Sequence, residues 1–319
     1  MGEDPFPTSE PFPTFEIEDL GEALAGPWRT PRNMLAEQEY DSHASLHDDA
    51  TAQKLGFKGG AVEGPTHYSQ FAPLGYAIWG QRWFEDGCCS AHYRSIVYDG
   101  EQVRAFIEKV PPGATTARTW MQKEDGTEVQ AGTASVGPDA ITALDGRLKT
   151  LSPLEPCVIL RDVKVGMKLP RHEVVMAADQ NMGALYPFSL DEKLEAITEP
   201  SDWYAKGSPW GAPIIPMEMI SVLLQYSSGG ARFPTRGPVV GLFADQEIRL
   251  VAGPLLVGQT YEIEREVAAL SGSRRTESLW VRTSVFEKGS DKLKATMLLN
   301  SASFKESYAR YAEELATLG

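Results

Sequence analysis

The sequence predicts an α+β fold in which one unit of helix and sheet occurs twice, and two observations support this. Each half of the chain has a segment of small residues and prolines that leads into a largely apolar stretch, followed by four strand-like segments. The two halves align at Arg94 with Arg249 and at Gly100 with Gly258, so the repeat spans about half of the 319 residues. A repeat of this length indicates duplication of a whole domain rather than a solenoid.

The apolar stretch of each half is expected to be a buried helix. The first is predicted over Thr66–Trp79, after residues 59–65, and the second over about Glu218–Tyr226, after residues 211–217. Proline is tolerated near the start of a helix because its missing N–H would have no partner inside the helix. Both stretches are apolar on most faces, which is typical of helices that are buried, here against a sheet.

The strand-like segments of each half are predicted to form an antiparallel meander. In the first half they are Ala91–Tyr98, Gln102–Val110, Thr115–Lys123 and Glu128–Val136. In the second half they are Gln246–Val251, Thr260–Ala268, Glu277–Phe286 and Lys294–Ser303. A sheet wrapped around one central helix is the hot-dog architecture. The sequence therefore predicts a double hot-dog, each half an antiparallel sheet wrapped around a central helix.

The chain is expected to divide into five segments. These are an extended N-terminal arm over 1–14, an N-terminal hot-dog domain over 15–145, a linker over 146–160, a C-terminal hot-dog domain over 161–305, and a helix or tail over 306–319. In the tail, Tyr308, Tyr311, Leu315 and Leu318 recur at helical spacing and would form the apolar face of a helix.

Composition and charge argue against several classes of function. The formal net charge is −14, and an acidic chain is a poor general binder of nucleic acid because phosphates attract a basic face. The sequence has no polybasic cluster of the kind that holds peripheral proteins on membranes, and no apolar run near the roughly 18 residues of a membrane-spanning helix. Its first residues do not resemble a signal peptide. We therefore expect a cytoplasmic protein with a small-molecule partner, and neither nucleic acid nor membrane.

The cysteines and the charge distribution add two expectations. Cys88, Cys89 and Cys157 include no C-x-x-C pair, so reduced thiols, no metal site and no cofactor are expected. Residues 1–160 contain 12 basic and 24 acidic residues, whereas residues 161–319 contain 18 and 20. This asymmetry suggests that the halves do different work, and it leaves few cations in the first half for the phosphates of coenzyme A.

Titratable side chains gather between Tyr40 and Asp49, shortly before the first helix. His43 and His47, two of the five histidines, lie four residues apart in this stretch. The N-terminus of a helix offers free N–H groups and a positive dipole end, which suit a carbonyl oxygen, and a carboxylate and an imidazole beside it could activate water. The alternative is structural, since Asp48 or Asp49 could simply cap a short helix.

This stretch resembles the active-site block of the MaoC-like hot-dog hydratases and dehydratases, in their tandem form. The matching residues are Leu46-His47-Asp48-Asp49, Ala52, Leu55-Gly56-Phe57-Lys58-Gly59-Gly60, Val62 and Gly64. The resemblance covers most of residues 15–137, and Val97–Glu101 resembles the strand turn of the same proteins. The second half resembles the same fold without the motif.

The resemblance implies an enzyme that adds or removes water at a double bond conjugated to a thioester or related carbonyl. Asp41 and His47 match the catalytic pair, although they lie six residues apart rather than the family's five, and His43 would replace the motif's Asn. The N–H of Gly64, with that of Gly60, would hold the carbonyl oxygen. Glu63 would be a favourable first-turn anion or a second acid–base group.

Two other functions remain open on this sequence. A hot-dog thioesterase would use Glu63 to activate water at the carbonyl, and a non-catalytic acyl-ligand binding protein would keep the fold without the chemistry. The chain is expected to be a monomer with pseudo-dimeric halves or a homodimer. Aromatic residues in and after the first helix would either pack the core or line a substrate tunnel: Tyr68, Phe71, Tyr76, Trp79, Trp83 and Phe84.

Overall fold

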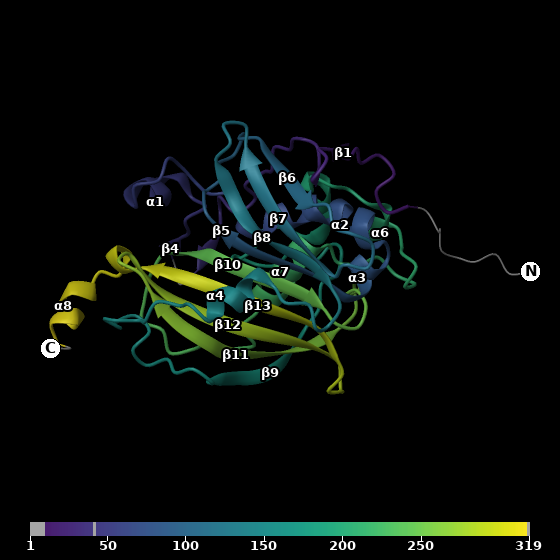
Figure 1. Cartoon of the computed structure of the whole chain (residues 1–319). Helices are drawn as coiled ribbons and strands as arrows, with labels where there is room; N and C mark the ends of the chain where they lie inside the picture. The colour runs from purple at the N-terminus through teal and green to yellow at the C-terminus, as the bar shows by residue number, and fades with distance from the viewer. Residues whose placement is uncertain (1–9, 41–42, 318–319) are drawn as a thin grey trace, which may run out of the picture.

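The computed structural model describes residues 10–40 and 43–317, and within them one continuous antiparallel sheet of eleven strands runs through the molecule. The strand order is β1-β2-β6-β7-β8-β5-β10-β13-β12-β11-β9. All strands of the first half therefore lie on one side of the pair formed by β5 and β10, and all strands of the second half lie on the other (Figure 1). The two predicted sheets are joined edge to edge.

Six of the eight predicted strands agree with the structure to within four residues at each end. The predicted strand Ala91–Tyr98 is displaced, since the observed strand covers Gly87–Tyr93, and the predicted strand Gln246–Val251 begins earlier, at Gly241. The short strands that open each half were not among the eight predicted. The observed strands of the first half are β1 (Glu18–Asp19), β2 (Ala23–Ala25), β5 (Gly87–Tyr93), β6 (Val103–Glu108), β7 (Thr116–Lys123) and β8 (Glu128–Val136). Those of the second half are β9 (Lys168–Val174), β10 (Gly241–Leu250), β11 (Tyr261–Gly272), β12 (Thr276–Glu287) and β13 (Leu293–Phe304). A separate short pair is formed by β3 (Glu39–Tyr40) and β4 (His43–Ala44).

The central helix of each half is buried, as expected, but the first is not one continuous α-helix. A 3₁₀-helix, η1 (Gly64–Phe71), leads into α2 (Ala72–Trp79), and both begin with a proline within their first two residues. Pro73 has no N–H to donate to the preceding turn, so the chain changes from one helix type to the other at this point. The second central helix is α7 (Met217–Gln225), and only its last residue is not buried.

Both halves of the chain also contain shorter helices. They are α1 (Asp49–Lys54), α3 (Arg82–Asp86), α4 (Ala143–Leu148), α5 (Leu190–Ala196), α6 (Asp202–Ala205), η2 (Lys305–Ser307) and α8 (Tyr311–Ala316). In Figure 1, α4 crosses in front of the sheet, and α1 and α8 both lie toward the end opposite to α2 and α3, α1 above and α8 below.

Equivalent positions in the two halves confirm that one fold is repeated. In each half, a residue just before the central helix forms an isolated β-bridge to the segment that follows β5 or β10. The two bridges are Ala61 with Tyr98 and Ile214 with Leu256. Gly100 and Gly258 both adopt a positive φ, 85° and 77°, which favours glycine at that turn. The chain is therefore an α+β double hot-dog.

The predicted tail helix is only partly correct. The helix α8 covers six residues, and Tyr308 lies before it, buried against a cluster that contains Val158 and Val267. Its hydroxyl donates to Glu314 at 2.8 Å, whereas Leu315 is exposed. The prediction from helical spacing fails here because the chain first turns through η2 before the helix begins. Leu318 lies outside the described residues. Within residues 10–40 and 43–317, no helix could span a membrane.

Candidate active site

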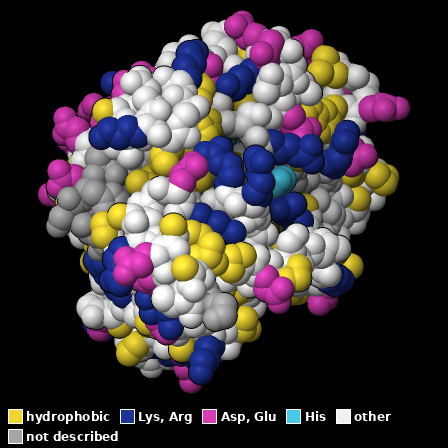
Figure 2. Space-filling model, turned by 90° about the vertical axis from the view of Figure 1, so that its left-hand side faces the viewer, with side chains coloured by type: hydrophobic (Ala, Val, Ile, Leu, Met, Phe, Trp, Pro, Cys, Tyr) yellow, Lys and Arg dark blue, Asp and Glu magenta, His cyan; other side chains and the backbone are white. Residues whose placement is uncertain are grey.

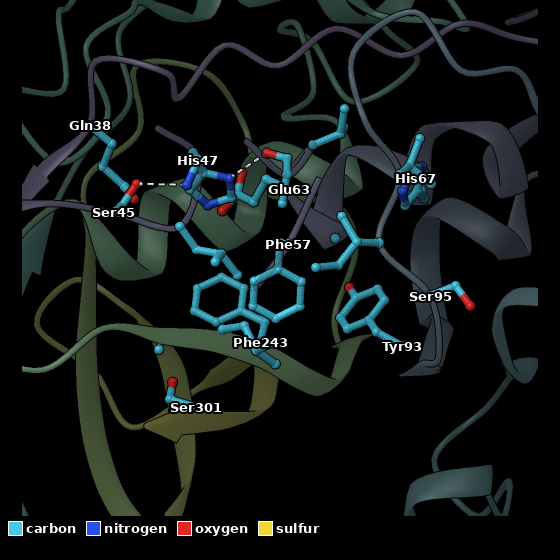
Figure 3. A pocket seen from close by; sticks show the side chains of 18 of the residues that line it. Gln38, Ser45, His47, Phe57, Glu63, His67, Tyr93, Ser95, Phe243 and Ser301 are labelled. Atoms are coloured by element: carbon cyan, nitrogen blue, oxygen red, sulfur yellow. Dashed lines mark hydrogen bonds between the residues drawn. The ribbon is translucent and has the colours of Figure 1, made fainter. Parts of the chain in front are cut away.

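A cavity of about 420 Å³ lies where the two halves meet, and both contribute to its wall. From the first half it is lined by Leu46, His47, residues 61–64, His67 and the end of β5 around Tyr93. From the second half it is lined by Leu185, Tyr186, Gln225, residues 239 and 241–243, Ser301 and Ser303. Figure 3 shows His47, Glu63 and the aromatic rings of Phe57 and Phe243 around this space. The half without the motif thus supplies part of the wall.

The backbone of His47 is held by three neighbours. Its N–H donates to Ser45 Oγ at 3.1 Å, and its carbonyl accepts from Asn33 Nδ2 at 2.9 Å. Gly60 packs directly on the same carbonyl, where a Cβ would overlap the oxygen. The motif glycine at this position therefore serves close approach to the His47 backbone.

The imidazole of His47 has a defined orientation and tautomer. Its Nδ1 lies 2.6 Å from the Ala61 carbonyl oxygen, and because a carbonyl only accepts, Nδ1 must carry the proton. Burial lowers the pKa of His47 to about 4, and the bond to Ala61 only partly opposes this shift. At neutral pH the ring is therefore uncharged, and its Nε2 keeps a free lone pair, as a general base requires.

Glu63 is a buried carboxyl group in the same cavity wall. Burial raises its pKa to about 7; the nearby Glu218 acts in the same direction, while Lys193 and a hydrogen bond from the Tyr186 hydroxyl, at 3.3 Å, oppose the rise. Near neutral pH this side chain is divided between its protonated and ionised forms. It can therefore donate or accept a proton in the pH range where His47 is neutral.

Gly64 begins η1 and lines the cavity. Its N–H has no hydrogen-bond partner among the residues that the structure describes, as expected for the first residue of a helix. A Cβ on Gly64 would lie 2.6 Å from the Tyr93 ring, so the backbone can approach the strand only with glycine here. This N–H is free to bind a carbonyl oxygen.

The other candidates from the motif have different outcomes. The N–H of Gly60 donates to Asp49 Oδ1 at 2.7 Å, so it is already engaged, and we leave it out of the site. Asp48 caps α1 by accepting from the Thr51 N–H at 2.8 Å, which is the structural role considered for it. Asp41 lies outside the described residues. His43 is described only by its backbone, which pairs with Tyr40 between β4 and β3.

Two residues near the cavity were not singled out from the sequence. His67 lies in the turn of η1 after Gly64, and its buried Nδ1 has no partner among the described residues. Burial, and the charge of Lys193, lower its pKa to about 3, so it is neutral. The position of His67 three residues after Gly64 could have suggested this histidine from the sequence. Tyr186 lies in a loop of the second half, and no local pattern indicates its role.

The aromatic residues around the first helix belong to the core. Tyr68, Phe71, Trp83 and Phe84 are buried in the largest hydrophobic cluster, against which Tyr76 and Trp79 pack. None of the six lines this cavity. Within the described part of the chain, no group of three or more His, Cys, Asp or Glu side chains could hold a metal ion.

Comparison with known proteins supports this description of the fold. A putative MaoC domain dehydratase from Chloroflexus aurantiacus superposes with a TM-score of 0.50 at 13% identity, over 95% of this chain and 99% of that one. A conserved hypothetical protein of Mycobacterium tuberculosis with a double hot-dog fold reaches 0.53 at 11% identity, over 91% and 96%. The chain has a MaoC-like double hot-dog fold. Neither the family models nor the curated protein sequences gave a match to it. At these identities, the MaoC-like likeness is one of fold alone.

Proposed function

We propose that this protein is a hydratase or dehydratase acting on a double bond conjugated to a thioester or related carbonyl. The observation that carries the proposal is the hydrogen bond from His47 Nδ1 to Ala61, because it leaves Nε2 as a base in the cavity. The free N–H of Gly64 lies in the same wall. A base and an oxyanion donor facing one cavity are the two parts that addition of water to an enoyl thioester needs.

In the hydration direction, His47 Nε2 takes a proton from water while the water oxygen bonds to the β-carbon. The electrons of the double bond move toward the carbonyl, and the negative charge that develops on its oxygen is stabilised by the Gly64 N–H. A protonated carboxyl group then gives a proton to the α-carbon. Dehydration is the same sequence reversed, with His47 returning the proton to the departing hydroxyl.

Two carboxyl groups are candidates for the proton on the α-carbon. Asp41 is the residue that the resemblance assigns to this role. Glu63 is the described carboxyl group that lines the cavity, with a pKa raised to about 7. We assign the acid to Asp41, with Glu63 as an auxiliary group, and His43 replaces the motif's Asn.

The surface offers a place for an anionic carrier of the thioester. On the face that carries α1 and α8, Lys and Arg side chains gather around a histidine near the middle of the view (Figure 2). Lys and Arg side chains bind phosphate groups. A phosphate-bearing carrier such as coenzyme A is therefore part of the proposal.

One observation favours a thioesterase as the second candidate. If the ionised form of Glu63 activates water, attack falls on the carbonyl carbon and the thiol leaves. The position of Glu63 next to the free Gly64 N–H suits this reaction, because the same donor would hold the oxyanion.

A panel of enoyl thioesters and free enones distinguishes these reactions. The proposed hydratase converts the enoyl thioester to the 3-hydroxyacyl thioester without releasing thiol. Release of thiol at the same rate as substrate loss would identify a thioesterase. Ligand-dependent stabilisation of the fold without any turnover would identify a binding protein.

A further inference from the structure

A second cavity, of about 670 Å³, adjoins the candidate active site. Leu185, Gln225 and Ser301 line both cavities, so the two spaces are separated by no more than these side chains. The wall of the second cavity comes almost entirely from the half that lacks the motif, and it is mixed, with apolar side chains such as Phe233, Leu279, Val281 and Leu299 beside polar and charged ones. The shared side chains place this cavity beside the space that His47 lines.

Arg265 is a buried cation in the wall of this second cavity. In β11, Tyr261, Ile263, Arg265 and Val267 form one row of inward-facing residues, and Arg265 is only 8% exposed. Its Nη2 donates to the carbonyls of Leu224 and Ser227, at 2.6 and 2.7 Å, at the end of α7. Its Nε and Nη1 have no partner, and no carboxylate lies within ion-pair distance, among the described residues.

Capping of α7 explains only part of this arrangement. The last carbonyl groups of a helix need hydrogen-bond donors, and Nη2 of Arg265 supplies two of them. The Nε and Nη1 atoms of Arg265 carry three further N–H groups. Leaving a charge buried without a counter-ion is costly, so buried arginines are ordinarily paired. Glu39, the acidic residue of this cavity wall, is exposed to solvent. The remaining donors of Arg265 are therefore available to a ligand.

We propose that Arg265 binds a carboxylate at the far end of the substrate's acyl chain, so that the substrates are thioesters of unsaturated dicarboxylic acids. This inference rests on the proposed function, since it places the conjugated double bond at His47. The planar fork of a guanidinium matches a carboxylate through two parallel hydrogen bonds. A second cation, Arg232, also lines this cavity but is exposed to solvent, so Arg265 is the buried cation that a carboxylate would meet.

Three enoyl thioesters of equal length test this with the wild-type protein alone. They end in a carboxylate, a methyl ester or a carboxamide. We expect the carboxylate to have the highest kcat/KM. Arg265→Met should reduce that preference by roughly 10- to 100-fold, as loss of a charge-assisted bidentate contact predicts. Arg282→Met, on the exposed side of the neighbouring strand, is the matched control and should keep the preference. Equal kcat/KM values for the three substrates in the wild type would overturn the proposal.

A binding experiment separates this proposal from the proposed function. Calorimetric titration of wild-type protein with a saturated dicarboxylic acid, its monoamide and 3′,5′-ADP needs no turnover. Preferential binding of the dicarboxylic acid that is lost in Arg265→Met supports the inference even if no thioester is hydrated. If Arg265→Met does not fold, Arg265→Lys keeps the charge and the helix cap, and we expect it to weaken this binding. Binding of 3′,5′-ADP in place of the diacid would show that Arg265 serves the carrier's phosphates and would overturn the proposal.

Discussion

The Nδ1 of His47 donates its proton to the carbonyl oxygen of Ala61 across 2.6 Å, and this contact fixes the tautomer of the ring. The acceptor is a backbone atom of a segment that is itself fixed, since the Ala61 N–H donates to Leu46 at 3.2 Å and Ala61 bridges to Tyr98. The tautomer of His47 therefore depends on the fold around the motif rather than on a second side chain.

This contact predicts the protonation state of His47 directly. Because burial lowers its pKa to about 4, the ring should stay neutral, with the proton on Nδ1, as the pH falls from 8 to about 5. Nitrogen NMR shifts of the His47 ring should show a protonated Nδ1 and an unprotonated Nε2 over this range. A ring that becomes charged near pH 6.5, as an exposed histidine does, would contradict the assignment.

The pKa of Glu63 predicts that kcat/KM changes with pH around neutrality, which gives one limb of the pH profile. Since this pKa is raised to about 7, the protonated form is lost as the pH rises through 7. If Glu63 assists as an acid, activity should fall over that interval, and Glu63→Gln should remove the fall. Activity that instead rises through pH 7 in the wild type and not in Glu63→Gln would show that the carboxylate is the active form, as in a thioesterase.

The buried pair of Lys193 and Glu218 should control that limb. Lys193 is 3.8 Å from Glu218, and its charge lowers the pKa of Glu63. Lys193→Met should therefore raise the pKa of Glu63 and move the limb to higher pH. It should also lower the free energy of unfolding by about 3–5 kcal/mol, because an uncompensated carboxyl group remains buried. Lys206→Met, at an exposed pair with Asp202, should change neither quantity measurably.

Gly64→Ala tests the oxyanion donor. The new Cβ would lie 2.6 Å from the ring of Tyr93, so the start of η1 must shift away from the strand. Loss of one oxyanion donor typically lowers kcat by about 10²–10³-fold. Gly56→Ala is the comparison variant. Gly56 has a positive φ of 83°, so alanine is strained there too, but the space around it is open. We expect kcat to fall far more in Gly64→Ala; similar losses in the two variants would argue against a role for the Gly64 N–H.

Much of the fold could be predicted because it depends on local patterns. Glu128–Val136 matches β8 residue for residue, since the Asp125-Gly126 turn comes just before the strand and apolar residues alternate along it. The tail could not be predicted in the same way. There the spacing of Tyr308 and Leu315 is helical, but long-range packing of Tyr308 determines where the chain turns.

The position of the candidate residues around the cavity was predictable where the motif is local and not where it depends on tertiary contacts. His47 and Gly64 line the cavity as the motif implies. The role of Gly60 differs, because the hydrogen bond from its N–H to Asp49 depends on how α1 folds back on the loop. Tyr186 and Arg265 come from the other half, more than a hundred residues away along the chain, so no spacing in the motif could indicate them.

The most direct test of the account is the rate of water addition to an enoyl thioester by wild-type protein and by His47→Ala. The account predicts that the wild type gives the 3-hydroxyacyl thioester. The substitution should lower kcat by about 10²–10⁴-fold, the usual contribution of a general base, in a protein that still folds. His172→Ala, on β9 at the far edge of the sheet, is the control and should keep the rate. Undiminished hydration by His47→Ala would contradict the central claim.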